Sequence, residues 1–115
     1  MKLPREAGGG VVIAREKLTN YLLVRQSRSD KSEFLARGGF TSENPDVLVA
    51  GLSLLAEQDD AQPVDENKFG RYFEITGMLR GPNGLGLRVQ TIWMTEHLSG
   101  GTKFVTLIPI EVVRP

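Results

Sequence analysis

The fold is decided by residues 70–96, GRYFEITGMLRGPNGLGLRVQTIWMTE. Aromatic and β-branched residues, which favour strands, fill both ends of this stretch, and the sequence GPNG at residues 81–84 is typical of a tight turn. We therefore predict an antiparallel hairpin whose strands are residues 70–80 and 86–96.

The hairpin extends into a larger sheet. A second turn at residues 99–101 precedes another strand-type segment, Lys103–Ile110, which can pair with the strand before it. Residues 11–13 are apolar and β-branched, and they are a candidate for a further strand. The sequence thus predicts a C-terminal antiparallel sheet of three to four strands.

Three segments that precede the hairpin have the apolar spacing of helices. The first covers residues 14–23. Its apolar stripe consists of Ala14, Leu18, Tyr21 and Leu22. The second covers residues 31–37, where Asp30 can cap the start and the glycine pair 38–39 ends the helix. The third covers residues 44–55, opens with an Asn-Pro pair, and is apolar around most of its circumference, so we expect it to be the most buried helix.

Helices followed by strands are typical of the α+β class. We expect about three N-terminal helices to pack on one face of the sheet, with the polar, proline-containing stretch 57–67 as a loop between them. Residues 1–115 then form a single α+β domain in which residues 1–10 are flexible. The expected core consists of Leu18, Leu22, Phe34, Leu48, Leu52, Leu55, Val89 and Trp93.

Composition excludes several kinds of chemistry. The chain has no cysteine and one histidine, His97, so it lacks a disulfide framework, a cysteine nucleophile and a two-histidine acid–base pair. The glycines at 81–86 lie between strands rather than before a helix, and the acidic residues of 57–66 lack the ligand order of a calcium loop. We therefore expect no metal ion and no cofactor.

The location also follows from the sequence. The first residues lack the basic and then apolar layout of a secretory signal, and no apolar run approaches the roughly 20 residues of a membrane-spanning helix. We expect a cytoplasmic protein with no membrane partner, and the sequence does not indicate an oligomeric state.

The charge is balanced in total but uneven along the chain, with 14 basic and 14 acidic residues. Residues 15–37 carry six basic and three acidic side chains, a net of +3, and residues 68–114 carry the same. Between them, residues 43–66 carry seven acidic side chains and no basic ones, a net of −7. Such a surface can hold a local basic cleft for nucleic acid, although the solvated faces of an ordinary domain give the same pattern.

Arg88 lies on a predicted strand, where alternation places it on one face with Gln90, opposite Thr91 and Trp93. If helices cover one face, an open face with cations and hydroxyls can bind a phosphodiester and stabilise the charge that develops during its cleavage. The simpler interpretation makes Arg88 a solvated cation, Thr91 a strand-forming residue and Trp93 a core aromatic.

Several short motifs carry a resemblance to known proteins. They are Lys17-Leu18 with Tyr21-Leu22-Leu23, Lys31-Ser32 with Phe34-Leu35 and Gly38, Gly70 with Tyr72-Phe73, Gly77 with Leu79, Gly81-Pro82 and Gly84, Arg88-Val89 with Thr91-Ile92-Trp93, and Phe104-Val105-Thr106 with Pro109. In these motifs, over about residues 11–110, the chain resembles a small bacterial domain of unknown function. It is similar to the ribonuclease toxin domains of the barnase/EndoU/colicin/RelE type.

The resemblance implies a metal-independent endoribonuclease of toxin type, with RNA and a cognate antitoxin or other protein as partners. The positions that it implies for catalysis are Lys17, Lys31, Arg88, Thr91 and Thr106. Lys17 or Lys31 would bind or protonate, Arg88 would stabilise the pentavalent phosphate, and a threonine hydroxyl would orient the scissile group.

The alternative is a non-catalytic protein-interaction module that uses the acidic loop and the third helix. The two hypotheses differ in where they place the basic residues. An enzyme should gather Lys17, Lys31 and Arg88 around one cleft, whereas a binding module should disperse them and present an apolar patch.

Overall fold

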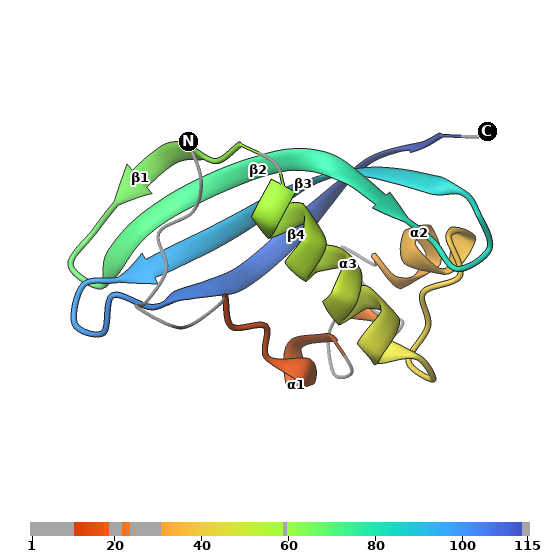
Figure 1. Ribbon diagram of the computed structural model, residues 1–115, viewed down its shortest axis with the longest axis horizontal. Helices are drawn as coiled ribbons and strands as arrows, with labels where there is room; N and C mark the ends of the chain where they lie inside the picture. Colours follow the sequence, from red (N-terminus) through yellow and green to blue (C-terminus); the bar gives the residue numbers. More distant parts are fainter. Residues whose placement is uncertain (1–10, 19–21, 24–30, 59, 114–115) are drawn as a thin grey trace.

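The computed structural model describes residues 11–18, 22–23, 31–58 and 60–113. Its centre is an antiparallel sheet in the order β1-β2-β3-β4, in which each strand pairs with its neighbour in the chain (Figure 1). The strands are β1 (Gln62–Glu66), β2 (Gly70–Arg80), β3 (Gly86–Glu96) and β4 (Thr102–Val113). The predicted hairpin thus forms the two central strands of the sheet. The predictions for residues 1–10, Tyr21 and Asp30 lie outside the described residues.

The prediction of three N-terminal helices packed on the sheet is wrong. In the part of the chain that the structure describes, α2 (Ser32–Arg37) and α3 (Pro45–Gln58) exceed one turn, whereas α1 (Arg15–Lys17) has only three residues. The amide of Leu23 donates to the carbonyl of Leu18, five residues back, and this spacing is wider than that of an α-helix. The apolar spacing of this segment therefore reflects contact with the core rather than a regular helix. None of the described helices is long and apolar enough to span a membrane.

One hydrophobic core lies between the helices and one face of the sheet, which α3 crosses diagonally (Figure 1). The ring of Trp93 packs edge-on against Phe104, with 5.4 Å between the ring centroids. Seven of the eight expected core residues are buried in this cluster, and Phe34 is partly buried against it. As predicted, α3 is the most buried of the described helices, with Leu48, Leu52, Leu55 and Ala56 in the core, although it also exposes Val47 and Leu54.

Both edge strands, β1 and β4, contain a proline next to a shift in register. β1 lies in the stretch predicted as a loop, because all its residues are exposed and show no apolar alternation. The register of β1 shifts between Pro63 and Asp65, and the register of β4 shifts between Pro109 and Glu111. Each edge strand therefore carries a proline beside a bulge, where a missing N–H is tolerated. The central strands β2 and β3 contain no proline.

The predicted early strand at residues 11–13 is a single bridge. Val12 pairs parallel to Lys103 at the edge of β4. Its amide donates to the carbonyl of Thr102 at 2.8 Å, and its carbonyl accepts from the amide of Phe104 at 2.9 Å. Val12 thus bonds to the first residues of β4, while its neighbours Val11 and Ile13 pack against the core.

The turn between β2 and β3 docks against the end of α2. An ideal Cβ built on Gly81 would lie 1.8 Å from the carbonyl oxygen of Gly38, so only glycine allows this close approach. The side-chain amide of Asn83 donates to the carbonyl of Arg37 at 2.7 Å. These contacts join the helical part of the chain to the tip of the central hairpin.

Candidate functional site

The face of the sheet that points away from the core carries exposed and half-buried side chains, and we call it the open face. Register assigns to it Tyr72, Glu74, Thr76 and Met78 of β2, Arg88, Gln90, Ile92 and Met94 of β3, and Lys103, Thr106, Ile108 and Glu111 of β4. Antiparallel pairing places these side chains in rows across the strands. Two of the rows are Tyr72–Met94–Lys103 and Met78–Arg88–Glu111.

Arg88 lies on the open face, and its Nε donates to Oε1 of Glu111 at 3.1 Å. Both side chains of this ion pair are largely in solvent. Because an exposed ion pair contributes little free energy, the guanidinium can exchange Glu111 for another anion at low cost.

Lys31 and Thr106 are brought together although they lie 75 residues apart in the sequence. The Nζ of Lys31, which lies just before α2, donates to Oγ1 of Thr106 on β4 at 2.9 Å. Burial disfavours the charged ammonium and lowers the pKa of Lys31 below its ordinary value of 10.5. The structure thus joins two of the five predicted site residues at the β4 edge of the sheet.

Thr91 lies on the core face rather than the open face. It is buried, its hydroxyl donates to the carbonyl of Ile75, and the same hydroxyl accepts from the indole N–H of Trp93. Lys17 is the last residue of α1, and its side chain is not among those that the structure describes. The four predicted residues whose side chains are described are therefore distributed over the edge, the open face and the core.

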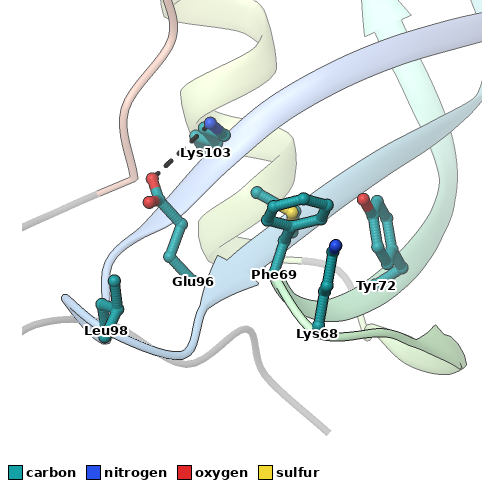
Figure 2. A pocket seen from close by; sticks show the side chains of 7 residues that line it. Lys68, Phe69, Tyr72, Glu96, Leu98 and Lys103 are labelled. Atoms are coloured by element: carbon teal, nitrogen blue, oxygen red, sulfur yellow. Dashed lines mark ion pairs between the residues drawn. The ribbon is translucent and has the colours of Figure 1, made fainter.

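A pocket on the open face contains residues that the sequence analysis missed (Figure 2). It has a volume of about 350 Å³ and lies where the β1–β2 turn meets the β3–β4 turn. Its lining consists of Lys68, Phe69, Tyr72, Met94, Glu96, Leu98 and Lys103. Two sequence features could have indicated this pocket. They are the Lys68-Phe69 pair in a polar turn and the outward-facing positions of Tyr72 and Lys103 on their strands.

A second pocket of about 350 Å³ lies beside α2, with a lining of Leu23, Ser32, Glu33, Ala36, Phe40, Thr41 and Ser42. Neither Lys31 nor Arg88 lines either of these two pockets. Within the described ranges, no three His, Asp or Glu side chains lie close enough to hold a metal ion. On the open face, Arg88 and Lys103 each lie in an ion pair with a carboxylate, that of Glu111 and that of Glu96.

The fold is that of a small α+β domain. The strands of its antiparallel sheet follow one another in chain order, and helices cover one face of the sheet while the other stays open. The chain belongs to the family described as "Domain of unknown function (DUF6883)", whose model matches residues 2–111.

The fold is similar to a solved chain in the "Contact-dependent growth inhibition toxin - immunity protein complex from Klebsiella pneumoniae 342". The TM-score is 0.61 at 17% sequence identity, and the match covers 88% of this chain and 94% of that chain. At this identity the likeness is one of fold. A comparison with curated proteins found no match.

Proposed function

We propose that this domain is a toxin-type endoribonuclease that binds RNA on the open face and cleaves it without a metal ion. The observation that carries the proposal is the position of three polar groups, one on β3, one on β4 and one just before α2. These are Arg88 on the open face and the bonded pair Lys31 and Thr106 at its edge. A fold shared with a chain of a toxin–immunity complex is compatible with this class of protein.

RNA carries its own nucleophile, the 2′-hydroxyl. This oxygen gives its proton to a base and attacks the adjacent phosphorus, while the bond from phosphorus to the 5′-oxygen breaks and that oxygen takes a proton from an acid. The products are a 2′,3′-cyclic phosphate and a 5′-hydroxyl. The protein must supply proton exchange and a cation for the charge on the pentavalent phosphate.

Lys31 and Thr106 are suited to the proton exchange. The lowered pKa of Lys31 makes its amine a better proton donor and acceptor than an ordinary lysine at physiological pH. The Thr106 hydroxyl accepts from Lys31 and keeps its own proton to donate to a phosphate oxygen. Of the two predicted threonines, we therefore place Thr106 at the site. Thr91 lies in the core, where it supports the strand that carries Arg88.

Arg88 is suited to stabilise the phosphate. Four positions along β3 separate it from Ile92, the register partner of Thr106, a distance of about 13 Å along the strand. Long side chains from both ends of this interval can converge on one phosphodiester.

The test compares the wild type with Arg88→Ala and Lys31→Arg on total RNA in the presence of a chelator. We expect cleavage to 2′,3′-cyclic phosphate ends by the wild type and a loss of about 100-fold or more in Arg88→Ala. Lys31→Arg keeps the charge but cannot give up the proton, so it should lose cleavage while retaining RNA binding. Arg71→Ala is the matched control, because Arg71 lies over the ring of Phe73 on the other face of the sheet.

Circular dichroism of each variant shows whether it is folded. A folded wild type that leaves RNA intact in chelator and shows no salt-sensitive binding would contradict the proposal. Binding through phosphates should weaken steeply with salt, because each neutralised phosphate releases counterions.

A second candidate is the protein-interaction module, and the surface of α3 favours it. Val47 and Leu54 are exposed on this helix, and the acidic residues Asp65 and Glu66 lie on β1, which follows it. Exposed apolar side chains and acidic side chains are groups that a basic protein partner could contact. If this is the function, titration with poly-lysine should show binding that Asp65→Asn with Glu66→Gln weakens, while RNA stays intact.

A further inference from the structure

The pocket on the open face lies next to the residues proposed for cleavage. Its row Tyr72–Met94–Lys103 is followed by the row Glu74–Ile92–Thr106, one step of about 7 Å along the strands. A nucleotide chain bound at Thr106 therefore extends over the pocket if it continues toward the β3–β4 turn.

Phe69 is the most unusual residue of the pocket, because 63% of its surface is exposed while its backbone is held in place. Its amide donates to Oδ1 of Asn67 at 2.9 Å, and its carbonyl accepts from the amide of His97 at 3.0 Å. The side chain of Asn67 also accepts from the amide of Gly70. These bonds present an aromatic ring to solvent from a fixed turn, an arrangement that reduces the entropy cost of binding.

One cation lies over this ring, and a second lines the same pocket. The ammonium of Lys68 lies 5.1 Å from the centroid of the Phe69 ring, and Figure 2 shows both side chains with Tyr72 beside them. On β4, Nζ of Lys103 lies 3.6 Å from Oε1 of Glu96. Aromatic faces on which bases stack, with lysines for the backbone, are the usual composition of a site for single-stranded nucleic acid.

We infer that this pocket binds one unpaired nucleobase of an RNA substrate, stacked on Phe69, with Lys68 and Lys103 contacting the flanking phosphates. This inference rests on the proposed function. Glu96 can accept a hydrogen bond from an N–H group on the edge of the base. The volume of about 350 Å³ is at the lower end of the range for small-molecule pockets, as a single base requires.

The test measures binding of a short single-stranded RNA whose 2′-hydroxyls are methylated, so that it cannot be cleaved, by fluorescence anisotropy at fixed salt. Loss of one stacked base weakens binding about 5- to 150-fold, and we expect Phe69→Ala to do so. Phe69→Leu should behave like Phe69→Ala, whereas Phe69→Trp should bind as well as the wild type. Leu98→Ala is the matched control, since Leu98 lines the pocket, is fully exposed and has no ring.

Two outcomes separate the subsite from the catalytic proposal. If RNA is never cleaved but binding depends on the ring of Phe69, the nuclease proposal is lost and the base subsite stands. If the wild type cleaves RNA while Phe69→Ala binds and cleaves equally well, the subsite is wrong and the nuclease proposal stands. Full binding by Phe69→Leu would also overturn the subsite, because a purely apolar contact, as with a protein partner, does not need the ring.

Discussion

The indole N–H of Trp93 donates to the hydroxyl of Thr91 at 2.8 Å, and this hydroxyl donates in turn to the carbonyl of Ile75 at 3.0 Å. All three residues are completely buried. The threonine thus satisfies a buried donor on its own strand and a carbonyl on the neighbouring strand β2. This small network links the largest core side chain to the backbone of the sheet.

Thr91→Val should destabilise the domain, because the isosteric methyl group leaves the indole N–H without a partner. A buried unsatisfied donor costs about 1–3 kcal/mol, and urea unfolding followed by Trp93 fluorescence measures this difference. Thr91→Ser keeps the hydroxyl and should lose less. Equal stability of Thr91→Val and the wild type would show that the network contributes nothing.

Gly81→Ala should be far more damaging than Gly84→Ala, although both glycines lie in the same turn. An added Cβ at Gly81 would meet the backbone of Gly38, so α2 and the hairpin must move apart. Gly84 has a φ of +92° but open space around it, and alanine there costs about 1–2 kcal/mol from the left-handed conformation alone. Chemical denaturation of both variants provides the comparison, and the prediction is wrong if they unfold at the same midpoint.

The stability contributed by Lys31 should depend on pH in the alkaline range. Its pKa is lowered by burial, so the folded state releases this proton at lower pH than the unfolded chain, whose lysine keeps the ordinary value of 10.5. Between these two pKa values the unfolded state binds more protons, and stability therefore rises with pH. Relative to Lys31→Met, the wild type should gain stability as the pH rises through this interval toward 10.5. A flat or falling difference in the unfolding free energies would contradict this.

Glu111→Gln should strengthen RNA binding without a large change in stability. The substitution removes a negative charge from the open face and releases Arg88 for phosphate. An exposed ion pair contributes about 0–1 kcal/mol, so the unfolding free energy should move by no more than that. We expect a several-fold gain in affinity at low salt that disappears at high salt. Unchanged binding at low salt would indicate that Arg88 does not contact the RNA.

The central strands could be predicted from the sequence because their side chains alternate between a core and an open face. The alternate positions 87, 89, 91 and 93 of β3 are buried, and positions 88, 90 and 92 between them are only half-buried, which is the period-two signal of a sheet covered on one side. The fully exposed β1 has no such alternation. It was predicted as a loop because its pairing depends on β2 and not on its own pattern.

The helical part was harder to predict for a related reason. Leu18 and Leu22 have helical spacing and are buried, yet the bond from Leu23 to Leu18 departs from an α-helix. The prediction that these apolar residues are buried was correct, but the predicted regular helix was not. In the candidate site, the sequence named Lys31 and Thr106 without indicating that they touch, since nothing in a sequence relates residues 75 positions apart.

The prolines beside the bulges of both edge strands, Pro63 and Pro109, affect whether folded molecules can aggregate through their sheet edges. A sheet whose outer strands present complete rows of N–H and C=O groups can act as a template for strands of other molecules. Here each outer row is interrupted, so a second copy cannot continue the ladder across either edge. We therefore expect the folded domain to resist fibril growth in concentrated solution, even though its two central strands have a strongly sheet-forming sequence.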